Sequence, residues 1–347
     1  MVREKKRNHT ASSFTRVNKG RVRALGRGVR SKNILQSPPD AEKTSDEPAT
    51  CSGRRVVEAQ RPSVLGAQGG LRRERPLAIG NWNITTLTGK EQELVEEAKY
   101  YRLDIVGISS TRFRGSGTVD LDRGWKLHYS GVATSLSAQA GVGILTSPRL
   151  ADCVIEWIPL GGRVCLLKLR LKEGPLWLVQ VYAPNRESKY RSFLDEVTAA
   201  LAVVKTESFV LLGDFNAHVG IDHLTWKGVI GRNGDPDLNA NGEALLDFCA
   251  INGLSIMNTF FQHKDTHKYT WYRDTLGQRS IIDFFIVSGL FDSVLDVRVK
   301  RGAELSTDHH LVVCNLRLST ARRTRKTGRS CATYRTKWEA LADDGVR

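Results

Sequence analysis

A carboxylate and an amide follow an apolar run near the middle of the chain. The run Phe209–Gly213 has the composition of a buried strand, and Asp214 and Asn216 come directly after it. Side chains two residues apart lie on the same side of an extended chain. In that arrangement the carboxylate can orient a water as a general base, and the amide can hold the water or a phosphate oxygen. The alternative is an Asx turn that only ends the strand.

A second carboxylate lies inside an apolar strand. Asp283 interrupts the run Ile281–Val287, where an unpaired charge would be costly. Asp308 and His309 open another apolar run, and His309 is the natural partner for Asp283. Such a pair would fix the tautomer and orientation of the imidazole, which could then donate to a developing oxyanion. The alternative is that His309 and His310 are surface histidines.

Two further strand ends carry polar groups. Asn83 ends the run Leu77–Asn83 and could supply a carbonyl oxygen to a hard cation, although a plain turn would use the same residue. Tyr182 and Asn185 lie on either side of an Ala-Pro turn that follows the run Leu176–Tyr182. The Tyr182 hydroxyl could reach a phosphate, or its ring could simply pack against neighbouring side chains.

Ten apolar runs and three helical patterns are available to position these residues. The predicted strands are Leu77–Asn83, Asp104–Ser109, Gly141–Ser147, Val164–Arg170, Leu176–Tyr182, Phe209–Gly213, Leu254–Met257, Ile281–Val287, Asp296–Lys300 and Leu311–Leu318. A helix is predicted from Thr88, with Glu91 three residues later completing a capping box. Two more helices are expected, one after Ser188 and one through Leu245 and Cys249. This pattern predicts one α/β or α+β domain.

The net charge of +15 is carried by the two ends of the chain. Residues 1–75 hold 18 basic and 7 acidic side chains, residues 319–347 hold 8 and 3, and the middle is nearly neutral. Residues 1–75 are therefore predicted to be a disordered basic tail, residues 76–318 a folded domain, and residues 319–347 a basic C-terminal linker. The two basic ends would add affinity for a polyanion such as DNA.

Composition argues against several other classes of protein. No run of about 18 apolar residues is present, so neither a transmembrane helix nor a membrane partner is expected. The N-terminus has no apolar stretch of the kind found in secretory signals. The six cysteines are scattered without metal-like spacing, which favours reduced thiols in an intracellular protein. Basic runs at Lys5–Arg7 and Arg54–Arg55 favour a nuclear or nucleo-cytoplasmic location, the alternatives being a solvated tail without an address or a mitochondrial transit peptide.

Taken together and in order, the strand-end motifs resemble the endonuclease/exonuclease/phosphatase superfamily, which includes DNase-I-like nucleases and apurinic endonucleases. The motifs are W-N at residues 82–83, Y-A-P-N at 182–185, G-D-F-N at 213–216, I-D-F at 282–284 and D-H at 308–309. The segments GDFNAHVG, WKGVIG and LLDFC are more closely similar to the endonuclease domain of LINE-type retrotransposons and of craniofacial development protein 2-like proteins. The resemblance covers residues 77–318. It implies an α+β fold, a four-layer αββα sandwich of two mixed β-sheets with helices outside.

The resemblance also implies a role for each position. Asp214 and Asn216 match the pair that orients and deprotonates the attacking water, and Tyr182 matches a tyrosine that contacts the scissile phosphate. His309 matches the histidine that stabilises the transition state, with Asp283 as its partner. The remaining positions are Asn83 and Asp308 on the metal side and Asn185 and Asn241 on the substrate side.

One position departs from the pattern of the superfamily. A metal-binding glutamate usually ends the second strand, and here the run Asp104–Thr111 places Ser110 at that position. A hydroxyl is a far poorer ligand for Mg²⁺ than a carboxylate. This degenerate position predicts weakened binding of the expected cofactor, Mg²⁺ or Mn²⁺. The residues for water activation and phosphate stabilisation are all present.

Three functions are consistent with these residues. The leading hypothesis is a metal-dependent phosphodiesterase, a hydrolase that acts as a nicking DNA endonuclease and whose activity is weakened by Ser110. The second is a catalytically inactive protein, derived from such a domain, that binds nucleic acid or chromatin. The third is a phosphatase of the same superfamily. DNA is the expected partner with RNA as a further candidate, no small-molecule cofactor is expected, and the sequence indicates no oligomeric state.

Overall fold

The computed structural model describes residues 75–135, 140–205 and 207–318, which all fall within one compact unit, Gly69–Arg347. Apart from Arg75, the predicted basic tail with its two basic runs lies outside the described residues, as does the predicted C-terminal linker. The four cysteines of the described part, at positions 153, 165, 249 and 314, are buried and free, as expected. No helix in this part of the chain is long and apolar enough to span a bilayer.

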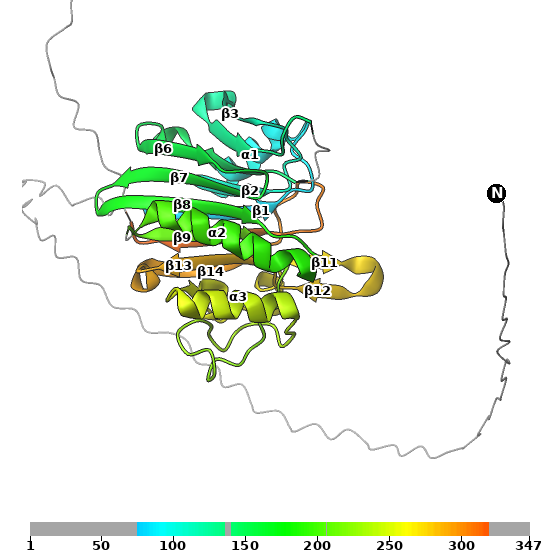
Figure 1. The fold of residues 1–347 in the computed structure, drawn as a ribbon. Coiled ribbons are helices and arrows are strands. Elements are labelled where there is room, and N and C mark those ends of the chain that lie inside the picture. The colour runs from blue at the N-terminus through cyan, green and yellow to red at the C-terminus, as the bar shows by residue number, and fades with distance from the viewer. Residues whose placement is uncertain (1–74, 136–139, 206, 319–347) are drawn as a thin grey trace, which may run out of the picture. The chain divides into compact units, whose positions relative to one another are not determined.

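The first sheet contains seven strands in the order β14-β15-β1-β2-β5-β4-β3 (Figure 1). They are β1 (Leu77–Asn83), β2 (Ile105–Ser109), β3 (Ser116–Asp120), β4 (Lys126–Ser130), β5 (Val142–Thr146), β14 (Val294–Lys300) and β15 (Leu311–Leu316). β1 and β2 run parallel, and the other neighbours are antiparallel. β1, β2 and β5 are buried along their full length, as expected for strands in the middle of a sheet covered on both faces.

The second sheet contains six strands in the order β10-β13-β9-β8-β7-β6. They are β6 (Val154–Pro159), β7 (Val164–Leu171), β8 (Gly174–Tyr182), β9 (Phe209–Asp214), β10 (Ser255–Ile256) and β13 (Asp283–Ser288). β8 and β9 form its parallel pair, and the remaining pairs are antiparallel. Both sheets are therefore mixed, as the resemblance implies.

The two sheets pack face to face, and helices cover their outer faces (Figure 1). The core between the sheets joins apolar side chains of β1, β2 and β5 to those of β7, β8 and β9. Helices α2 (Tyr190–Val204) and α3 (Ala240–Ile251) bury apolar residues against the six-stranded sheet. Helix α1 (Glu91–Tyr100) does the same on the seven-stranded sheet. The predicted α+β sandwich of two mixed sheets with flanking helices is confirmed.

The structure corrects the predicted start of the first helix. α1 begins at Glu91, and its N-cap residue Lys90 makes no side-chain capping bond. Gly89 adopts a φ of 80°, a left-handed conformation that separates Thr88 from the helix. The predicted capping box therefore does not form. The Lys90 ammonium group instead donates to three backbone carbonyl oxygens in nearby loops.

Five strands were not predicted because they lack a continuous apolar run. They are β3, β4 and β6 of the two sheets, and β11 (Trp271–Arg273) and β12 (Gln278–Ser280), which form a separate hairpin. β3 and β6 lie at sheet edges and expose many of their side chains. Strands of this kind carry polar residues that give no periodic apolar pattern.

Candidate active site

The ends of central strands from both sheets meet at one end of the sandwich. In the six-stranded sheet, Tyr182, Asp214 and Asp283 occupy neighbouring register positions on β8, β9 and β13. In the seven-stranded sheet, Asn83 at the end of β1 pairs with Ser109 of β2. The strand register thus brings together polar residues that are far apart in the sequence.

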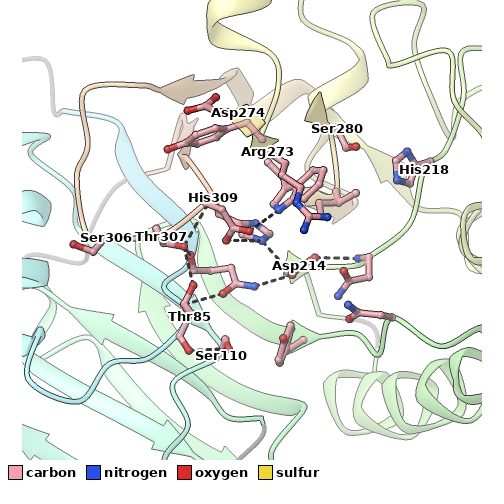
Figure 2. A pocket seen from close by; sticks show the side chains of 18 of the residues that line it. Thr85, Ser110, Asp214, His218, Arg273, Asp274, Ser280, Ser306, Thr307 and His309 are labelled. Carbon is pink, nitrogen blue, oxygen red and sulfur yellow. Dashed lines mark hydrogen bonds and ion pairs between the residues drawn. The ribbon is translucent and has the colours of Figure 1, made fainter. Parts of the chain in front are cut away.

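An open cleft with a volume of about 1080 Å³ lies over these strand ends (Figure 2). Nine of the ten predicted site residues line it, namely Asn83, Ser110, Tyr182, Asn185, Asp214, Asn216, Asn241, Asp308 and His309. The tenth, Asp283, is fully buried and contacts the ring of His309. All predicted site residues are therefore gathered in one region, while the role of each stays a prediction.

Asp214 is a buried carboxylate with a raised pKa. Its Oδ2 accepts a hydrogen bond from Asn83 Nδ2 at 2.8 Å, and its Oδ1 accepts one from the backbone N–H of Asn216 at 3.0 Å. Burial and the negative charge of Asp283 raise the pKa of Asp214 to about 7, against the opposing effect of His309 and the two hydrogen bonds. A carboxylate with a pKa near neutrality, oriented by two donors, has the properties of a general base.

His309 faces Asp214 and is held by Asp283. Its Nδ1 donates to Asp283 Oδ2 at 2.9 Å, and its Nε2 lies 4.0 Å from Asp214 Oδ2. Burial lowers the pKa of His309, but the carboxylates of Asp283, Asp214 and Asp308 together outweigh this effect and raise the pKa to about 9. The imidazole is therefore positively charged at neutral pH. The pairing of Asp283 with His309 that was predicted from the cost of a buried carboxylate is present.

Two threonines that the motifs did not indicate hold Asn83 in place. Thr307 Oγ1 donates to the carbonyl oxygen of Asn83 at 2.8 Å and lies 3.1 Å from Thr85 Oγ1. The backbone N–H of Thr85 donates to Asn83 Oδ1 at 3.0 Å. These contacts fix the Asn83 amide so that its Nδ2 faces Asp214. The only indication of Thr307 in the sequence is its position directly before the D-H motif.

Asp308 lies at the exposed rim of the cleft beside the β11–β12 hairpin. Its side chain is 58% exposed, and its Oδ1 lies 4.0 Å from His309 Nε2. Its Oδ2 accepts a hydrogen bond from Trp271 Nε1 at 2.8 Å. Trp271 begins β11 and also forms an isolated antiparallel bridge with His309. Because the hairpin was not predicted, the contribution of Trp271 to the site was missed as well.

Ser110 occupies the position where the resemblance predicts a glutamate. Its backbone is left-handed with a φ of 62°, and its Oγ donates to the carbonyl oxygen of Thr85 at 3.3 Å (Figure 2). Tyr182 lies beside it, and burial together with the charge of Asp214 raises the pKa of Tyr182 against an opposing hydrogen bond with Ser110. Tyr182 is therefore a neutral hydroxyl at physiological pH and can donate to a phosphate oxygen.

Asparagines form the part of the cleft next to α3. Asn241 Nδ2 donates to the backbone oxygen of Asn216 at 3.0 Å, and Asn216 Nδ2 donates to the backbone oxygen of Ala183 at 3.0 Å. Asn241 Oδ1 is buried and accepts no hydrogen bond from the described residues. Asn185 is exposed at the rim. Asn241 thus holds the backbone at Asn216, and Asn185 offers an amide to a molecule in the cleft.

The donor types of Asp308, Asn83 and Ser110 suit a weakly held divalent cation. Asp308 contributes one carboxylate, Asn83 an amide oxygen and Ser110 a hydroxyl oxygen, and all three residues line the cleft. Asn83 Oδ1 already accepts one hydrogen bond and Ser110 Oγ donates one, so each oxygen keeps a lone pair. Mg²⁺ is usually bound through one or two carboxylates, with water and substrate phosphates as further ligands. A single carboxylate meets the lower limit of this requirement.

Gly213 allows β8 and β9 to approach closely beneath the site. A Cβ atom at this position would lie 2.0 Å from the carbonyl oxygen of Val181. We expect Gly213→Ala to lower the free energy of unfolding by about 1–3 kcal/mol or more, as measured by urea denaturation. Gly161→Ala is the matched control, since a Cβ there meets no atom within 4 Å. An equal loss in both variants would contradict the steric explanation.

Known proteins resemble this chain in sequence. A family described as endonuclease-reverse transcriptase matches residues 176–313. Craniofacial development protein 2 of Bos taurus is 29% identical over 246 residues, which are 69% of this chain and 41% of that protein. The RNA-directed DNA polymerase from mobile element jockey of Drosophila funebris is 25% identical over 267 residues, which are 75% of this chain and 25% of that protein. The chain thus spans less than half the length of these curated relatives.

Solved structures resemble the chain in fold. The endonuclease domain of TRAS1, a telomere-specific non-LTR retrotransposon, superposes with a TM-score of 0.53 at 20% identity and covers 70% of this chain and 99% of that domain. The catalytic domain of Xenopus laevis APE2 superposes with a TM-score of 0.54 at 18% identity, and the match covers 71% of this chain and 94% of that domain. The predicted resemblance to the DNase-I-like endonuclease/exonuclease/phosphatase superfamily is confirmed. Members of this superfamily are generally hydrolytic and typically depend on a divalent metal.

Proposed function

We propose that the protein is a metal-dependent phosphodiesterase that nicks DNA, like the endonuclease domains of LINE-type retrotransposons. The observation that carries the proposal is the arrangement of two groups in one open cleft. Asp214 has a pKa of about 7, and His309 is held positive by the buried carboxylate of Asp283. Similarity to a retrotransposon endonuclease and to a mobile-element polymerase supports DNA as the substrate.

In this proposal Asp214 accepts a proton from the attacking water. Asn83 and the backbone of Asn216 hold the carboxylate, so that it is oriented before the water binds. The water oxygen forms a bond to phosphorus while the bond from phosphorus to the leaving oxygen breaks. The low exposure of Asp214 keeps its proton affinity high enough for this transfer.

His309 stabilises the negative charge that develops on the phosphate. Its charged ring donates from Nε2 to a non-bridging oxygen, while Asp283 keeps Nδ1 occupied and the ring in place. Tyr182 donates its hydroxyl proton to another phosphate oxygen, and Asn241 and Asn185 contact the nucleic acid. A donor fixed before the reaction requires no reorganisation when the charge appears.

Asp308, Asn83 and Ser110 would hold the divalent cation, Mg²⁺ or Mn²⁺. When bound, such a cation supplies Lewis-acid stabilisation of the charge on the phosphate and the leaving oxygen. Asp308 is the only carboxylate of this set, and a hydroxyl at position 110 adds little affinity. We therefore propose that nicking by the protein is weak because Ser110 stands where a glutamate would bind the metal.

Restoring the carboxylate tests this proposal. We expect Ser110→Glu to lower the Mg²⁺ concentration needed for half-maximal nicking of supercoiled plasmid by about tenfold or more, because a second charged ligand binds the cation. Ser110→Gln is the matched control, since it has the same length without the charge. The measurement is the conversion of supercoiled to open-circular plasmid across a Mg²⁺ series.

The same experiment separates the proposal from its two alternatives. If the parent and Ser110→Glu both leave the plasmid intact while still binding it, the protein is a nucleic-acid-binding protein without nuclease activity. Release of inorganic phosphate from a small phosphate ester, with the plasmid untouched, would identify a phosphatase. Weak nicking by the parent and a gain with Ser110→Glu alone support the endonuclease.

The basic N-terminal residues supply a separate prediction. We expect removal of residues 1–74, which are strongly basic, to lower DNA affinity and to make its salt dependence shallower. Each lost phosphate contact reduces the slope of log K against log salt by about 0.9. Arg75 is kept because it forms an ion pair with Asp104. Fluorescence anisotropy at several salt concentrations measures the slope, and an unchanged slope would show that this segment does not touch DNA.

A further inference from the structure

A second group of side chains that could bind a metal lies beside the cleft that contains Asp214. His218 follows Asn216 in the loop after β9, and Asp235 and Asp237 lie in the loop before α3. One ligand atom from each of the three residues lies within 4.8 Å of the other two. We propose that His218, Asp235 and Asp237 bind a divalent transition metal of the zinc type, at a site separate from that of Asp308 and Asn83.

Asp235 supplies an independent reason to expect a cation. Its side chain is buried, with 9% relative exposure, and its Oδ2 has no hydrogen-bond partner within the part of the chain that the structure describes. A buried carboxylate oxygen without a donor is costly, and the cost is removed when a cation binds it.

The positive groups near Asp235 are directed to other partners. Arg279 lies with its guanidinium 4.0 Å from the centre of the Tyr269 ring and donates to Asp265 at 2.9 Å. Lys268 lies with its ammonium 5.5 Å from the same ring. Arg279 and Lys268 therefore leave Asp235 Oδ2 available to bind a metal directly.

Hydrogen bonds between two segments of the loop fix the backbone around the three residues. The N–H of Gly220 donates to the carbonyl oxygen of Asp237 at 2.9 Å, and the N–H of Asn239 donates to that of His218 at 3.2 Å. Asn239 Oδ1 accepts from the N–H of His218 at 3.1 Å and from that of Gly242 at 2.8 Å, so the same side chain caps α3. The two segments that carry the ligands are thus already held side by side.

The chemistry of the three donors favours zinc over magnesium or calcium. One imidazole and two carboxylates form a mixed nitrogen and oxygen set, whereas Mg²⁺ and Ca²⁺ prefer oxygen alone. Zinc bound by three protein residues commonly keeps a water as its fourth ligand. Zinc–ligand bonds of about 2.0–2.2 Å place the atoms of a tetrahedral ligand set roughly 3.4 Å apart. Displacements of about 1 Å would therefore bring the three ligand atoms to bonding distance from one ion.

The position of the site gives the metal a structural effect on the active site. His218 lines both the catalytic cleft and a smaller cleft of about 460 Å³ that also contains Asp235 and Asp237. In Figure 2 it lies on the far side of Asp214 from His309. A metal there would link the chain directly after Asn216 to the loop that leads into α3. It would thereby restrain the segment that carries the water-orienting pair.

Zinc binding by the full chain tests this inference without any measurement on DNA. The protein is stripped with a chelator and titrated with Zn²⁺ alone against a zinc-sensitive competitor dye. We expect the parent to bind zinc, and His218→Ala and Asp235→Asn each to weaken that binding about 100-fold or more. His223→Ala, a histidine change five residues further along the same loop, is expected to bind like the parent. Because nicking is not measured, the result is independent of the proposed function.

Two further measurements separate the outcomes. Asp235→Asn should melt at the same temperature as the metal-free parent or higher, because it removes a buried charge, and added zinc should raise only the melting temperature of the parent. Asp214, Asp283 and His309 also lie close enough together to hold an ion, so His309→Ala is titrated in parallel. Zinc binding that is lost only in His309→Ala, or binding that is unchanged in His218→Ala and Asp235→Asn, would overturn the inference.

Discussion

Asp214→Asn is expected to lower the rate of plasmid nicking about 10²–10⁴-fold, which is the usual contribution of a positioned general base. The amide has nearly the same shape as the carboxylate but does not accept a proton from water at neutral pH. Both carboxylate oxygens accept hydrogen bonds, from Asn83 and from the Asn216 backbone, so the amide of the variant keeps one of these bonds and loses the other. Single-turnover nicking with saturating DNA measures the chemical step.

A stability measurement shows whether the variant is folded. The pKa of Asp214 is raised on folding from 3.8 to about 7, so the protonated form is favoured in the folded state. The stability that this preference contributes is complete below pH 3.8 and is lost as the pH rises through about 7. Asp214→Asn removes this titration, so the urea midpoint of the folded variant should change less than that of the parent between about pH 3.8 and pH 7.

Asp222→Asn is the matched control for Asp214→Asn. Asp222 is exposed in the loop after β9 and accepts a hydrogen bond from the backbone N–H of Thr225. The Asp222→Asn protein is expected to nick DNA at the rate of the parent. A folded Asp214→Asn protein that nicks DNA as fast as the parent would contradict the assignment of Asp214 as the base.

The parts of the site that the sequence predicted share one physical property. Asp214 and Asp283 stand out because a charged group at the end of, or within, an apolar strand must have a compensating partner. That requirement alone indicated the pairing of Asp283 with His309. The buried strands β1, β2, β8 and β9 were predicted for a related reason, since their apolar runs are continuous.

The missed parts depend on contacts that have no local pattern. Trp271 reaches Asp308 from a three-residue strand whose partner is equally short, and no periodicity reveals such a hairpin. Thr307 donates from its hydroxyl group to Asn83, which is far away in the sequence, and this hydroxyl also contacts that of Thr85. The predicted capping box at Thr88 was wrong because Gly89 adopts a left-handed conformation. Local patterns therefore predict buried elements better than polar loops.

His309→Ala is expected to lower the nicking rate about 10²–10³-fold, the usual loss when one donor to a developing oxyanion is removed. The parent presents a charged imidazole with a pKa of about 9 opposite Asp214, and alanine leaves Asp283 without its partner. His310→Ala is the matched control, because the adjacent ring stacks on Tyr272 and does not line the catalytic cleft. Equal losses in both variants would indicate a structural role for this segment in place of a donor.

Asp283→Asn separates the positioning role of Asp283 from simple destabilisation through the pH dependence of nicking. The parent needs Asp214 ionised and His309 protonated, so its rate should be highest between about pH 7 and 9. Asp283 raises the pKa of both groups, and removal of its charge should shift both limbs of the profile to lower pH. The rate at pH 8 then falls because His309 has lost its proton there. A uniform decrease with both limbs unmoved would mean that Asp283 only supports the fold.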